Sequence, residues 1–241
     1  MNRTTSKESS LVTFNQAVCG PKYRKATWVC CILNLFNQQS GIGIVTVYAT
    51  RLLILIKEQT NGQFPISPLA GTIIIGVACA VFAVLGAFVV KMVGRRKILI
   101  IGSLGMGVCM AGTGLAIQEE WYLTAYLLLI AFIIFFNVSQ GNVAFIYAAE
   151  VTVDQASGIV MFFFFFSLCI LAFSAEYLMN SFLQVPGTFW LFGFLNFLGF
   201  LFCLIWIKET MGLTDAEQKV LYTTKSSSVM MGEDPDLKTE D

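Results

Sequence analysis

The sequence predicts an all-α membrane protein with six transmembrane helices, and three observations support this fold class. The composition is 56% hydrophobic with only 12% charged residues, which lies outside the range of soluble globular domains. Segments without any charged side chain recur along the chain, and most reach the roughly 20 apolar residues that a helix needs to cross a bilayer. The basic residues also fall almost entirely on one side of the predicted membrane.

The predicted transmembrane domain covers residues 26–207, with spans at about 26–52, 68–90, 98–117, 122–147, 155–178 and 188–207. The third span is rich in glycine, but each of its Leu, Ile and Val residues favours insertion by about 0.3 to 0.6 kcal/mol, which is sufficient in sum. Residues 1–25 contain no apolar segment typical of a signal peptide, so the first span is expected to direct insertion.

The distribution of lysine and arginine predicts the orientation. If six spans alternate across the membrane, thirteen of the 15 basic residues share a side with both termini, and Arg51 and Lys57 are the other two. Because cytoplasmic loops are enriched in basic residues, residues 1–25 and 208–241 are predicted to be cytoplasmic tails. In the second tail, Thr214 and Glu217 have the spacing of a capping box, which predicts a short helix through Leu221. A plasma-membrane location is the general expectation, since no address signal is visible.

Polar residues inside two spans indicate a candidate binding site. Positions 34, 38, 41, 45 and 48 share one face of the first span, and Gly41 and Gly43 are predicted to form a hinge where the helix can bend or open. The fourth span carries Asn137, Ser139, Gln140, Gly141 and Asn142. Buried amides need partners or a hydrated cavity, so two interpretations are open: the amides bridge packed helices, or they line a site for a neutral polar solute such as a sugar or polyol.

The residue types present argue against several other functions. The chain has no histidine, and its seven cysteines lack the spacing of metal ligands, so no metal or cofactor is expected. No nucleophile, base and orienting group cluster near an interface, which predicts that the protein is not an enzyme. No motif of a channel filter, voltage sensor or nucleotide-driven pump is present, and no nucleic-acid partner is expected.

Five short motifs, in order, resemble those of the sugar porters of the major facilitator superfamily, which include the facilitative glucose transporters. They are residues 23–25 (YRK), 37–43 (NQQSGIG) followed by Tyr48, 94–96 (GRR), 147–150 (YAAE), and 209–217 (ETMGLTDAE). The resemblance extends from about Tyr23 to Tyr222. It implies one half of that fold, the C-terminal six-helix half of the family's twelve helices.

Carried over position by position, the resemblance implies a substrate-binding role for Gln38, which matches a sugar-binding glutamine. The further lining residues would be Asn37, Tyr48, Asn137, Asn142 and Phe145. Several family positions are changed: Asn37 replaces a second glutamine, Gly43 and Cys79 replace asparagines, and Phe145 replaces a tryptophan.

The resemblance also implies a cytoplasmic salt-bridge network formed by Arg95, Arg96, Glu150 and Glu209, in which each exposed pair would contribute about 0.2 to 1 kcal/mol. An alternative is that the basic loop only sets the topology and contacts lipid headgroups.

Three functional interpretations follow. The chain is a carrier-like protein for a hexose-like sugar or other neutral polyol that works by alternating access and is incomplete as a single chain. Alternatively, it is a non-transporting sugar-porter paralogue, acting as a sensor or interaction subunit, or a truncated fragment of a twelve-helix sugar transporter. An isolated half would expose its inner amides at a cost of about 1 to 3 kcal/mol each, so a second copy or a separate N-terminal half is expected as a partner, in addition to the lipid bilayer.

Overall fold

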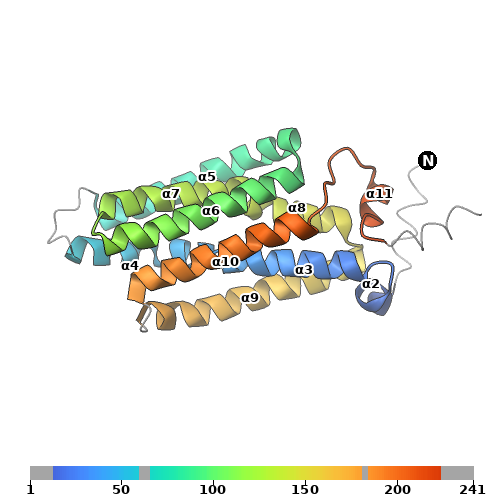
Figure 1. The fold of residues 1–241 in the computed structure, drawn as a ribbon, viewed down its shortest axis with the longest axis horizontal. Helices are drawn as coiled ribbons and strands as arrows, with labels where there is room; N and C mark the ends of the chain where they lie inside the picture. The colour runs from blue at the N-terminus through green and yellow to red at the C-terminus, as the bar shows by residue number, and fades with distance from the viewer. Residues whose placement is uncertain (1–12, 60–65, 181–183, 224–241) are drawn as a thin grey trace, which may run out of the picture.

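The computed structural model describes residues 13–59, 66–180 and 184–223, which form a bundle of long helices with two short helices at one end (Figure 1). The helices are α2 (Phe14–Cys19), α3 (Arg24–Gln39), α4 (Ile42–Gln59), α5 (Pro68–Val93), α6 (Arg95–Gln118), α7 (Tyr122–Val138), α8 (Gln140–Val151), α9 (Asp154–Asn180), α10 (Gln184–Trp206) and α11 (Asp215–Lys219). Helix α10 packs along α6, and α3 packs along α9 and α8. The short helices α2 and α11 lie at the same end of the bundle (Figure 1).

Five helical stretches in the described residues are long and apolar enough to cross a membrane. They are Pro68–Val93, Arg95–Gln118, Tyr122–Val151, Asp154–Ser174 and Gln184–Trp206. These stretches overlap the five predicted spans that begin at residues 68, 98, 122, 155 and 188. The first predicted span, 26–52, is not one continuous helix, because α3 and α4 are separate.

The break between α3 and α4 lies at Ser40 and Gly41. Gly41 has φ +94°, a left-handed conformation that continues neither helix. The Ser40 hydroxyl donates to the Asn37 carbonyl at 2.7 Å, so the side chain satisfies a carbonyl at the end of α3. The helix is therefore interrupted at one of the two glycines where the sequence predicted a weak point, whereas Gly43 lies inside α4. A hinge motion at this point stays a prediction.

Gly41→Ala is expected to lower the thermal stability of the protein. A non-glycine residue in the left-handed region costs about 1 to 2 kcal/mol. The added Cβ would also lie 3.0 Å from Met110 Cε and 3.1 Å from Phe192 Cγ. Thermal unfolding followed by size-exclusion chromatography in detergent measures the change. Gly76→Ala in α5 is the matched control, because its Cβ would meet nothing within 4 Å; equal losses in both variants would contradict the explanation.

The fourth predicted span is also broken, which the sequence did not predict. Ser139 separates α7 from α8 with φ −109° and ψ −95°. Its backbone N–H is shared between the Phe135 and Phe136 carbonyls, and its hydroxyl donates to the Phe135 carbonyl at 2.5 Å. A serine side chain that bonds the preceding turn competes with the helical backbone pattern. Gly102 of α6 lies directly against the Ser139 side chain, so α6 packs closely on this break.

In the described residues, apolar side chains form two large buried clusters and a small third one of Ala17, Val153 and Ala156. One large cluster joins α4, α5, α6, α7 and α10 around Met110, Leu129 and Phe132. The other large cluster joins α3, α6, α8 and α10 around Leu33, Leu99 and Tyr147. Many apolar side chains of α5 point outward, including Ile73, Val77 and Phe88, as expected of a transmembrane helix in contact with lipid.

Candidate functional site

The predicted substrate residues of α3 are buried next to the helix break. Asn37 is 2% exposed and Gln38 is 5% exposed. The Asn37 amide donates to the Gln140 carbonyl of α8 at 2.9 Å, which joins the end of α3 to the beginning of α8. Within the described residues, the Gln38 side chain has no hydrogen-bond partner. Its amide can therefore both donate to and accept from a ligand hydroxyl.

The predicted substrate residues of the fourth span face α5. The Asn142 amide donates to the Ala83 carbonyl of α5 at 2.8 Å and to the Asn137 carbonyl at 2.9 Å. The Asn137 amide donates to the Ile133 carbonyl of its own helix at 2.9 Å. This close approach of α5 uses Gly86, where a Cβ would lie 2.7 Å from Asn142 Nδ2. Both asparagines thus bridge or cap packed helices, which agrees with the packing interpretation for these two residues.

The remaining lining residue of α8, Phe145, contacts α9. Its ring meets Phe164 edge to face, with 4.9 Å between the ring centroids. The Tyr48 side chain lies outside the described residues. In the described part of the chain, no hydrogen bond joins Gln38 to Asn142, so a single site that includes both residues stays a prediction.

The chain itself buries the amides of α3. Asn34 is 0% exposed, and its amide donates to the Cys30 carbonyl at 3.0 Å. Gln38 is similarly enclosed. The chain therefore covers these two residues itself, although Asn34 Oδ1 has no hydrogen-bond partner in the described residues, so part of the burial cost remains.

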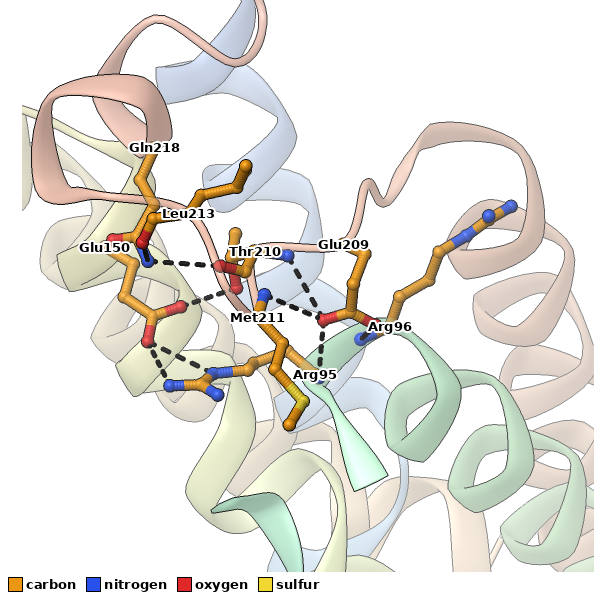
Figure 2. Close-up of polar contacts among 8 residues, drawn as sticks. All are labelled: Arg95, Arg96, Glu150, Glu209, Thr210, Met211, Leu213 and Gln218. Atoms are coloured by element: carbon orange, nitrogen blue, oxygen red, sulfur yellow. Dashed lines mark hydrogen bonds and ion pairs between the residues drawn. The ribbon is translucent and has the colours of Figure 1, made fainter. Parts of the chain in front are cut away.

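All four residues of the predicted ionic network come together at one end of the bundle (Figure 2). Arg95 binds Glu150 through two nitrogens, with Nη2 at 2.6 Å and Nε at 3.1 Å from the same carboxylate oxygen. The other oxygen of Glu150 accepts the Thr210 hydroxyl at 2.6 Å. Because the Arg95 and Glu150 side chains are only 20% and 16% exposed, this pair is shielded from water more than a surface ion pair.

Glu209 takes part through backbone N–H groups. Its carboxylate accepts from the N–H of Arg95 at 2.9 Å and of Arg96 at 3.3 Å, at the beginning of α6, and from Thr210 and Met211 at 3.1 Å (Figure 2). A carboxylate in this position satisfies helix N–H groups and interacts favourably with the helix dipole. The Arg96 guanidinium instead donates to the Leu204 carbonyl of α10 at 3.0 Å. Arg96 therefore joins the network through its backbone.

The segment after α10 folds back onto this end of the bundle. Helix α11 begins with the capping box predicted at Thr214 and Glu217. Lys219 Nζ donates to the Thr152 carbonyl at 2.5 Å, beyond the C-terminal end of α8, where a positive charge is favourable. Tyr222 is 8% exposed, and its hydroxyl lies 2.6 Å from the Tyr147 hydroxyl and donates to the Trp206 carbonyl at 2.7 Å.

Sequence reasoning missed the role of Tyr222. Its burial raises the pKa of its hydroxyl to about 12, so the hydroxyl keeps its proton at alkaline pH values where an exposed tyrosine would lose it. Tyr222 lies in a polar tail with no periodic pattern around it. The sequence feature that could have indicated its burial is the short apolar pair Leu221 and Tyr222, which follows α11.

Comparison with known proteins identifies the family. The profile described as "Sugar (and other) transporter" matches residues 1–222. The chain is 29% identical over 196 residues to the arabinose-proton symporter of Bacillus subtilis (strain 168), covering 79% of this chain and 41% of that protein. It is 27% identical over 223 residues to "Solute carrier family 2, facilitated glucose transporter member 2" of Gallus gallus, covering 89% and 40% respectively.

Solved structures support the same fold. The inward-open xylose transporter XylE from E. coli superimposes with a TM-score of 0.72 at 24% identity, covering 92% of this chain and 47% of that chain. The chain spans about 40% of the length of the curated relatives described above. With its apolar helices and this profile match over most of its length, the chain is a multi-pass membrane protein and belongs to the sugar (and other) transporter family.

Proposed function

We propose that the chain is the C-terminal six-helix half of a sugar porter and binds a hexose-like sugar or other neutral polyol as part of an alternating-access carrier. In this arrangement α3 and α4 together make the first of six spans, and both termini are cytoplasmic. The profile match and the sugar transporters among the relatives support the substrate class. A partner, either a second copy or a separate N-terminal half, belongs to the proposal, because the solute in such carriers lies at the interface between two halves.

The observation that carries the proposal is the Gln38 amide. Gln38 is 5% exposed beside the break between α3 and α4, and in the described part of the chain its side chain makes no hydrogen bond. Its amide atoms are not fully closed off, so they are open to a ligand or to water. A sugar hydroxyl can both donate and accept, which matches the two groups of an amide. The site offers amides and carbonyls without a fixed charge, which favours a neutral solute over an ion.

A second candidate is a non-transporting paralogue, such as a sensor or interaction subunit. The internal hydrogen bonds of Asn37, Asn137 and Asn142 favour it, because their amides are occupied within the chain. A truncated fragment of a twelve-helix transporter is the third possibility. Neither alternative requires saturable sugar uptake by this chain.

Gln38→Ala is expected to weaken sugar binding by about 3- to 10-fold, since one net hydrogen bond contributes about 0.5 to 1.5 kcal/mol. Equilibrium binding and uptake of radiolabelled D-glucose, D-xylose and L-arabinose would be measured with the protein in proteoliposomes. Gln39→Ala is the matched control, because the neighbouring Gln39 amide is already bonded to the Ser167 hydroxyl at 2.9 Å.

Three results would count against the proposal in different ways. Binding that is equal in the parent and in Gln38→Ala would remove Gln38 from the site. Saturable binding without uptake would show that the chain binds sugar but does not carry it without a partner. Absence of both for every sugar would end the carrier proposal for the isolated chain.

A further inference from the structure

A continuous set of buried polar side chains crosses the bundle at the level of the two helix breaks. We call it the polar belt and define it by Asn37, Ser40, Ser103, Gln140 and Asn196. All five residues are at most 2% exposed. They come from α3, the break after α3, α6, α8 and α10. The belt therefore joins four helices and includes residues from both interrupted spans.

The belt satisfies backbone groups that the first break leaves open. The Asn196 amide of α10 donates to the Ser40 carbonyl at 2.8 Å and to the Phe192 carbonyl of its own helix at 2.8 Å. The Ser40 hydroxyl in turn donates to the Asn37 carbonyl at 2.7 Å. Carbonyls at a helix end need partners from outside the helix. Asn196 thus binds the backbone at the point where α3 stops.

The second half of the belt holds the break between α7 and α8. The Asn37 amide donates to the Gln140 carbonyl at 2.9 Å, and the Gln140 amide donates to the Ser103 hydroxyl of α6 at 3.0 Å. Gln140 is the first residue of α8, directly after Ser139. The two breaks are therefore connected to each other and to the neighbouring helices α6 and α10.

Two amide oxygens of the belt make no hydrogen bond. In the described residues, Gln140 Oε1 and Asn196 Oδ1 are buried without a partner, and so is Asn34 Oδ1. A buried acceptor without a partner is unfavourable, and an apolar side chain would avoid the cost. What an apolar side chain could not supply at position 196 is the amide donor to the Ser40 carbonyl at the break.

We propose that Asn196 is a positioning residue that fixes the end of α3 and, through it, the Gln38 amide. Gln140 contributes through its backbone carbonyl, which accepts from the Asn37 amide. In the sequence, Gln38 lies between Asn37 and Ser40. The Asn37 amide donates to the Gln140 carbonyl, and the Ser40 carbonyl accepts from the Asn196 amide. Neither Asn196 nor Gln140 needs to touch a ligand in this arrangement. The identity of the ligand rests on the function proposed above, whereas the ordering of the break by the belt does not.

The test is hydrogen exchange of the full chain in lipid nanodiscs. Asn196→Leu is expected to speed amide exchange across residues 38–45 by about 10-fold or more, because the donor to the break is lost. Asn37→Leu, which removes the amide that donates to the Gln140 carbonyl, provides a second variant in case Asn196→Leu does not fold. Thr113→Val is the matched control, since Thr113 is equally buried but bonds only the Cys109 carbonyl of its own helix.

Sugar binding supplies the readout that a purely structural role would not change. If the parent binds sugar, Asn196→Leu should raise the Kd about 5-fold or more, while Thr113→Val should leave it unchanged. If the parent binds no sugar, the exchange result still decides whether the belt orders the break. Exchange that is unchanged, or raised equally throughout the bundle, would overturn the proposal. Local loosening without a change in Kd would overturn the positioning role.

Discussion

Gly102→Ala is expected to destabilise the protein by about 1 to 3 kcal/mol, the usual cost of forcing an extra methyl group into a packed core. The new Cβ would overlap the Cβ and hydroxyl of Ser139. Ser139 cannot simply rotate away, because its Cβ is fixed by the break and its hydroxyl is bonded to the Phe135 carbonyl. The backbones of α6 and α7 would therefore have to separate. The loss would be measured as a lower thermal midpoint and a smaller folded fraction in detergent.

The same helix provides the control. Gly107→Ala also adds a methyl group to buried α6, but the nearest atom to its Cβ would be the Gly193 carbonyl oxygen at 3.4 Å, an ordinary contact. Ser139→Gly removes the overlapping atoms, so the double variant Gly102→Ala with Ser139→Gly should lose less than the sum of the two single variants. Strict additivity would show that the overlap with Ser139 is not the cause.

Arg95→Ala is expected to cost about 1 to 3 kcal/mol, between the values for exposed and fully buried ion pairs. The change removes both bonds from Arg95 to the shielded Glu150 carboxylate. Of the Glu150 bonds drawn in Figure 2, the one from the Thr210 hydroxyl remains. Most of the loss should come from that unpaired charge. Adding Glu150→Gln to Arg95→Ala should therefore recover part of the stability, as measured by the thermal midpoint in detergent.

Arg96→Ala is the matched control for this prediction. Arg96 is the adjacent residue with the same side chain, but among the described residues its guanidinium bonds a carbonyl of α10 and no carboxylate. Its replacement leaves the backbone contacts of Glu209 intact, so a smaller loss is expected. A larger loss for Arg96→Ala than for Arg95→Ala would show that the pair with Glu150 is not the main stabilising contact of the network.

The sequence predicted features that depend on composition and on residue type. Apolar segments gave the five membrane-length helices, and Gly41 marked the first break because glycine alone adopts its left-handed conformation without strain. The residues of the ionic network were identified by short motifs on separate segments. The capping box at Thr214 was predicted because its two residues are close in the sequence.

Features that depend on contacts between distant segments were not predicted. The break at Ser139 carries no glycine or proline at the break itself, and its cause is a side-chain bond to the preceding turn. Asn196 was overlooked because it stands alone in an apolar span, although a lone amide in such a span is itself a signal. Likewise, the bond of Asn142 to the Ala83 carbonyl of α5 could not be read from its position on α8.

The tail that follows α10 determines where this protein can be shortened. Lys219 donates to the Thr152 carbonyl after α8, and Tyr222 donates to the Trp206 carbonyl at the end of α10. Without these side chains, the two carbonyls would lose these donors. The folded unit therefore extends at least to Tyr222, well beyond Trp206 at the end of α10. Deletions or fusion partners placed directly after α10 on the basis of hydropathy alone would remove these contacts.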